Sequence, residues 1–204
     1  MKGEGKLLTV NWIPCNGKQI LEHIDTSSGS WKHAYQLASI IEWENILTSC
    51  IDRTSLRIDD TYQWKLTVSV TCLSDDGNIR DLGLEGSIHA LRNLQMPKLE
   101  WDKERRWWRE NKTTTNLQLL YWPFSVTLMR SEQGVWIDRL TAEIEGQCDA
   151  MVVVTILSDI YTKTPYKSCI DHLGVISYFD LKKVFDQACT ICLAKVTQTV
   201  VAGS

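Results

Sequence analysis

The chain lacks an excess of basic residues, a long apolar run and a cysteine framework. Its 204 residues include 22 lysines and arginines against 25 aspartates and glutamates, a net charge of −3, so it has no general electrostatic attraction for nucleic acid. No run is long enough to span a bilayer, and the first twenty residues lack the apolar segment of a signal peptide. Seven cysteines without the spacing of a small disulfide framework favour a reducing intracellular compartment. We therefore expect a soluble protein of the cytoplasm or nucleus.

Motifs for the common catalytic and metal sites are also missing. The sequence contains no glycine-rich phosphate loop and no serine–histidine–aspartate arrangement. Its histidines are scattered without the spacing of metal ligands: His23, His33, His89 and His172. Cys189 and Cys192 form a C-x-x-C pair, but they share a helical stripe and have no second pair, which favours core packing over zinc. We expect no metal and no cofactor.

Apolar and aromatic residues are what the chain has in quantity. Hydrophobic residues make up 44 % of the sequence and nine residues are tryptophan, a composition typical of a folded domain. At this length the simplest organisation is a single domain, residues 1–204, with a good core. Tryptophan is enriched at protein interfaces, so the surplus indicates either partner-binding surface or additional core packing.

A strand, a turn and a helix are predicted between residues 62 and 97. Apolar and polar residues alternate from Tyr62 to Leu73, as in a strand with one buried face. Turn residues follow at 75–78, and Asp81 is the predicted N-cap of the helix. The core stripe of this helix is Leu84, Ile88 and Leu91.

Two glycines in this helix predict close packing. Gly83 and Gly86 each cost a helix about 1 kcal/mol relative to alanine, so we expect both to lie against a neighbouring element. We expect Pro97 to end the helical segment. Elsewhere the patterns predict strands at 7–13, 117–129, 135–138 and 150–157, helices at 31–51 and 180–196, and a hairpin or loop excursion at 100–116. The fold class is therefore α/β or α+β.

Short segments along nearly the whole chain carry the motifs of one family, in that family's order. They are Val10 to Pro14, Asp76 to Arg80, Ala90 to Pro97, Trp122 to Thr127, Val135 to Glu145 and Gly174 to Ala188. Together they resemble the RNase PH fold, and most of all the non-catalytic RNase PH-type subunits of the eukaryotic RNA exosome ring. The resemblance implies a mixed sheet with packed helices, of the ribosomal protein S5 domain 2-like type. The family's arginine-rich lead-in and first strands have no counterpart here, so the resemblance implies an N-terminally shortened domain.

The family's enzymes cleave RNA from its 3′ end with phosphate, and this sequence departs from their motifs. They hold the phosphate in a D-G-G-T-R turn at a helix N-terminus. Here the turn reads Asp76-Gly77-Asn78-Ile79-Arg80, and the segment 117–127, which should bring an aspartate, contains no acid. The resemblance therefore implies no catalytic residues and no enzymatic activity. The alternative is a phosphorolytic 3′-to-5′ exoribonuclease. Arg80 is interpreted as a surface arginine beside the helix start, and is also a candidate RNA contact.

The run from Trp101 to Arg109 mixes tryptophans with charges of both signs. Trp101, Trp107 and Trp108 are candidate interface residues, and Arg105, Arg106 and Arg109 are candidate RNA contacts. Four acidic residues balance the basic ones, which favours a solvated hairpin whose tryptophans anchor a neighbouring subunit.

The resemblance gives a specific functional expectation. The chain would be a structural subunit of the exosome ring, supporting RNA processing, including rRNA processing, and RNA degradation through packing and channel formation. Its partners would be other RNase PH-like ring subunits and cap proteins, with RNA reached indirectly through the channel and no membrane. Its location would be the nucleus, including the nucleolus, and the cytoplasm. A lone RNA-binding module is disfavoured by the net charge of −3.

Overall fold

The structure is a computed structural model that describes residues 8–13, 31–131, 133–138, 140–162 and 164–201. Its helices are α1 (Trp31–Cys50), α2 (Ile79–Arg92), α3 (Ala142–Gln147) and α4 (Tyr178–Val201), with a short 3₁₀ turn at Arg53–Leu56. Its strands are β1 (Leu8–Ile13), β2 (Leu66–Thr71), β3 (Gln95–Asp102), β4 (Trp107–Asn116), β5 (Tyr121–Arg130), β6 (Trp136–Ile137), β7 (Ala150–Asp159) and β8 (Pro165–Leu173).

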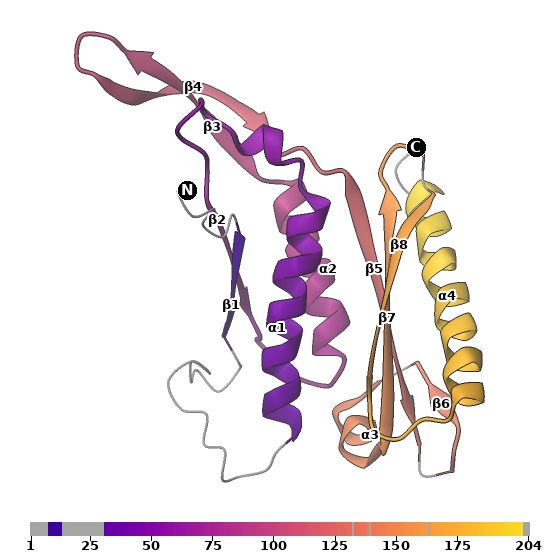
Figure 1. Ribbon diagram of the computed structural model, residues 1–204. Coiled ribbons are helices and arrows are strands. Elements are labelled where there is room, and N and C mark those ends of the chain that lie inside the picture. Colours follow the sequence, from indigo (N-terminus) through magenta and orange to yellow (C-terminus); the bar gives the residue numbers. More distant parts are fainter. Residues whose placement is uncertain (1–7, 14–30, 132, 139, 163, 202–204) are drawn as a thin grey trace.

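These elements form alternating layers of sheet and helix (Figure 1). Strands β1 and β2 pair in parallel, and β6, β5, β7 and β8 form an antiparallel sheet in that order. Helices α1 and α2 lie between the two sheets, while α4 covers the opposite face of the four-stranded sheet. The mixed α/β class expected from the sequence is confirmed.

The core has two main parts, one on each face of the four-stranded sheet. The first joins α1 and α2 to both sheets, and the second packs α4 against β5 and β7. Strand β7 has buried residues along nearly its whole length, as its run of Val152, Val153 and Val154 predicts for a strand covered on both faces. On α4, Val184, Ala188 and Cys192 are completely buried, in line with the predicted stripe.

Much of the predicted local structure around β2 and α2 is confirmed. In β2 the apolar residues are covered and their neighbours are exposed. Leu84, Ile88 and Leu91 are buried on α2. Gly83 also packs closely, because a Cβ built there would lie 2.3 Å from the ring of Trp43.

Three details of this region were predicted wrongly. The N-cap of α2 is Asn78, in the left-handed conformation, and Asp81 lies within the first turn of the helix. Gly86 is exposed, and a Cβ there would meet nothing within 4 Å. The helix ends at Arg92, and Pro97 lies in β3 beside an irregularity in its pairing with β4.

The sequence also left parts of the fold unpredicted. Strand β8 and helix α3 were not recognised as elements. In α1, Trp43 is buried, whereas Ile41 is 62 % exposed. None of the described helices is both long and apolar enough to cross a membrane.

Candidate functional site

The turn between β2 and α2 is where the resemblance would put a phosphate. This turn, residues 75–80, brings the chain to the N-terminus of α2 and packs against the start of α3. Gly77 has a φ of +92°, and a Cβ there would lie 2.6 Å from the backbone of Thr141. Only glycine fits this conformation and contact. The N–H of Ala142 donates to the carbonyl of Asp76 at 3.1 Å, which ties the two segments together.

Carboxylates of the chain itself accept the hydrogen bonds that this turn offers. The N–H of Gly77 donates to Asp75 Oδ1 at 3.0 Å, and the N–H of Asn78 donates to Glu145 Oε1 at 2.6 Å. Successive backbone N–H groups beside a helix N-terminus make a favourable place for an anion. Here the anionic groups are carboxylates of the chain itself, and one of them, that of Glu145, comes from α3.

Arg80 is buried in the interior of the protein. Only 6 % of the residue is exposed, and its guanidinium forms an ion pair with Glu42 of α1. A buried arginine with a carboxylate partner is costly to separate from it. The expectation of a surface arginine is therefore wrong, and Arg80 offers little surface to RNA in this conformation.

Strand β5 has no acidic residue of its own, and Asp81 of α2 brings a carboxylate to it. Both oxygens of this carboxylate accept hydrogen bonds within the fold. Thr127 donates its backbone N–H to Asp81 Oδ2 at 2.8 Å and its hydroxyl to Oδ1 at 3.1 Å. Both residues are buried. The contact fixes α2 against the centre of β5, so a structural role accounts for both oxygens.

The run 101–109 forms the end of the β3–β4 hairpin, which projects from the body of the protein (Figure 1). Trp107 is 51 % exposed and Trp101 is 47 % exposed. The Trp101 and Trp108 rings meet edge to face, with centroids 5.3 Å apart. Arg105, Arg106 and Arg109 are exposed nearby. The structure thus brings the candidate interface tryptophans and the candidate RNA-contacting arginines onto one protruding element.

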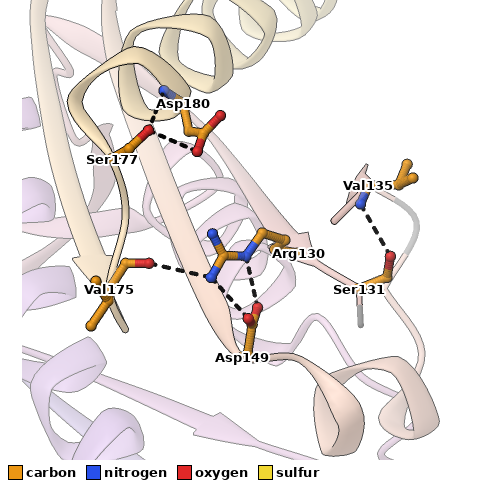
Figure 2. A network of polar contacts seen from close by, with 7 residues as sticks. All are labelled: Arg130, Ser131, Val135, Asp149, Val175, Ser177 and Asp180. Carbon is orange, nitrogen blue, oxygen red and sulfur yellow. Dashed lines mark hydrogen bonds and ion pairs between the residues drawn. The ribbon is translucent and has the colours of Figure 1, made fainter. Parts of the chain in front are cut away.

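A second polar feature lies at the opposite end of the four-stranded sheet from that hairpin (Figures 1 and 2). A cleft of about 270 Å³ is lined by Arg130, Ser131, Gly134, Trp136, Asp149 and Asp180. Arg130 donates to both oxygens of Asp149, at 2.9 and 2.8 Å, and to the carbonyl of Val175 at 3.3 Å. These bonds hold the pKa of the Asp149 carboxyl below its usual range. Among the described residues, no three histidine, cysteine, aspartate or glutamate side chains gather as a metal site.

Comparison with known structures agrees with the fold implied by the sequence motifs. The chain is similar to a chain described as "Archaeal exosome core", with 16 % identity and a TM-score of 0.60 over 95 % of this chain and 68 % of that one. It is also similar to rice (Oryza sativa) Rrp46, with 14 % identity and a TM-score of 0.53 over 97 % of this chain and 74 % of that one. The RNase PH-like fold of exosome subunits is therefore confirmed. No protein-family model matches the sequence, and the search of curated proteins finds no significant match.

Sequence reasoning missed the acidic partners of the β2–α2 turn. Glu145 lies 67 residues beyond Asn78, and Glu42 lies on a different helix from Arg80, so no local spacing reveals either contact. One signal was available for Glu145, since the segment 141–145 belongs to the same family resemblance as the turn. Asp149 could have been found from its place directly before the buried run that begins at Ala150.

Proposed function

We propose that the chain is a non-catalytic subunit of an RNA exosome-type ring, contributing interface area and part of the channel wall. The single observation that carries the non-catalytic part is the hydrogen bond from the Asn78 N–H to Glu145. An incoming phosphate would have to displace this carboxylate, and two anions cannot share the same donor at low cost.

Two further contacts support an inactive turn. The Arg80 guanidinium is engaged with Glu42 inside the fold, so it is not positioned as a free phosphate clamp. The carboxylate of Asp81, which bonds to the middle of β5, is buried against Thr127. The alternative, a phosphorolytic exoribonuclease, would require rearrangement of all three contacts before phosphate and RNA could react.

Two surfaces support the subunit part of the proposal. The β3–β4 hairpin presents exposed tryptophans away from the body, and partly exposed tryptophan is a common anchor at protein interfaces. Among the described residues, β1 and β2 pair only with each other, which leaves backbone edges able to accept a further strand. The likeness to exosome chains suggests ring subunits as the partners.

Affinity purification tests this proposal. We expect the tagged full-length chain, expressed in its own cells, to co-purify with RNase PH-type subunits and cap proteins in a complex of defined mass. The preparation would come from nuclei, including nucleoli, and from cytoplasm. A chain that elutes as a stable monomer from both fractions, with no such subunits by mass spectrometry, would reject the ring proposal.

A further inference from the structure

The cleft beside Arg130 contains more carboxylates than it can neutralise. Its lining includes Asp149 and Asp180 but a single described cation, Arg130. The guanidinium already makes two hydrogen bonds to Asp149. Asp180 accepts from the hydroxyl of Ser177 at 2.8 Å (Figure 2). Arg130 attracts the Asp180 carboxylate electrostatically, but its hydrogen bonds go to Asp149 and Val175. The described lining, with two carboxylates and one guanidinium, therefore carries a net charge of −1.

Large apolar side chains are exposed on the two segments that contribute Asp180 and Trp136 to the cleft. Phe179 is 82 % exposed and Tyr178 is 76 % exposed, directly before Asp180 on α4, and their rings lie 6.1 Å apart. Val175, whose carbonyl accepts from Arg130, is 88 % exposed, and Val135 is 56 % exposed on the turn that follows β5. Exposed apolar side chains on segments that also carry polar groups are typical of a protein-binding surface.

We propose that this cleft binds a segment of a partner protein that carries one lysine or arginine between apolar residues. The basic side chain pairs with Asp180 in the cleft, and its apolar neighbours cover Phe179, Tyr178 and Val175. Nucleic acid is a poor match, because its phosphates would approach two carboxylates and only one guanidinium, which is already bonded. The inference depends only on this local surface and stands whether or not the chain belongs to a ring.

Binding of short peptides to the ¹⁵N-labelled full-length chain tests the proposal. The probe is an acetylated, amidated peptide with one lysine between leucines, followed by nuclear magnetic resonance at the indole N–H of Trp136 and the amides of 175–180. Matched peptides replace the lysine with arginine or with uncharged norleucine. We expect both basic peptides to shift these signals and the norleucine peptide to bind roughly tenfold more weakly, as expected for loss of one charge-assisted contact.

Variants of the chain identify the residues responsible. Asp180→Asn keeps an acceptor for Ser177 and should weaken binding of the basic peptides roughly tenfold while leaving the norleucine peptide unchanged. Phe179→Ala should weaken all three peptides, and it provides a second test if Asp180→Asn does not fold. Glu104→Gln, an exposed carboxylate change on the hairpin, is the control and should have no effect. Equal binding of lysine and norleucine peptides, or shifts of the same signals by a single-stranded RNA oligomer instead, would overturn the proposal.

Discussion

Glu145 accepts a hydrogen bond from the backbone N–H of Asn78 at 2.6 Å and thereby closes the N-terminus of α2 with an internal carboxylate. The contact joins two motifs that are far apart in the sequence, and it occupies a backbone donor at a helix N-terminus, a position that favours anions. It also fixes α3, a helix of six residues without buried side chains, to the body of the fold.

Removing the Glu145 carboxylate should destabilise the protein. Glu145→Ala leaves the Asn78 N–H without its acceptor, and a hydrogen bond to a charged group contributes about 1.5–3 kcal/mol. We expect a loss of this size in the free energy of unfolding from urea melts. Glu143→Ala is the matched control on the same turn of α3, where the side chain is exposed, and should change stability by less than about 0.5 kcal/mol. Equal effects of the two variants would show that the Asn78 contact contributes nothing.

The two glycines of α2 should respond to alanine in opposite directions. At Gly83 the new methyl group would lie 2.3 Å from the buried ring of Trp43, and overpacking of this kind costs about 1–3 kcal/mol. At Gly86 the methyl group meets nothing, so the better helix propensity of alanine should raise stability by up to about 1 kcal/mol. Thermal melts of the two variants provide the measurement, and stabilisation by Gly83→Ala would contradict the placement of α1 against α2.

Gly83 and Gly86 show how much of the packing of α2 could be predicted from the sequence alone. The pattern of apolar residues predicted α2 and its buried stripe, because periodicity reports which face is covered. It could not separate Gly83 from Gly86, because the difference depends on Trp43, which arrives from another helix. The sequence likewise predicted a helix N-terminus near the acidic turn. It placed the N-cap at Asp81, which instead uses its carboxylate for Thr127 on β5.

The same limit applies to the candidate site. The exchange of Gly-Thr for Asn-Ile in the turn suggested an altered phosphate site, since that comparison is local. Arg80 was interpreted as a surface residue because a helix start beside a turn is usually exposed. Its burial follows from the packing of α1 over α2 and from Glu42, neither of which is visible in the motif.

Trp107 on the hairpin should matter for association more than for folding. About half of its surface is exposed, so Trp107→Ala should alter the free energy of unfolding little. Truncation of a tryptophan that is a hot spot of an interface costs about 2 kcal/mol or more of binding energy, roughly thirtyfold in affinity. Pull-down of an RNase PH-type ring partner with graded salt washes would show the loss. Lys112→Ala, exposed on the same strand, is the control, and an equal loss from both variants would argue against a tryptophan anchor.

Cys50 and Cys192 should resist alkylation in the folded protein. Burial raises the pKa of each thiol to about 12, so at pH 8 almost none of the reactive thiolate is present. Iodoacetamide followed by peptide mass spectrometry should label both residues only after denaturation. Raising the pH toward 10 should leave them protected while the fold persists. Rapid native labelling of either residue would contradict the packing of α1 or α4.

Phosphate-dependent RNA cleavage tests the central claim most directly. The purified chain, alone and within its co-purified complex, is incubated with 3′-labelled single-stranded RNA, inorganic phosphate and magnesium, and released nucleoside diphosphates are separated and counted. The account predicts that the purified chain releases no nucleoside diphosphate, and that any release by the complex is unchanged by Glu145→Gln in this chain. Phosphate-dependent release of nucleoside diphosphates that rises or falls with Glu145→Gln would show that the β2–α2 turn is an active phosphate site.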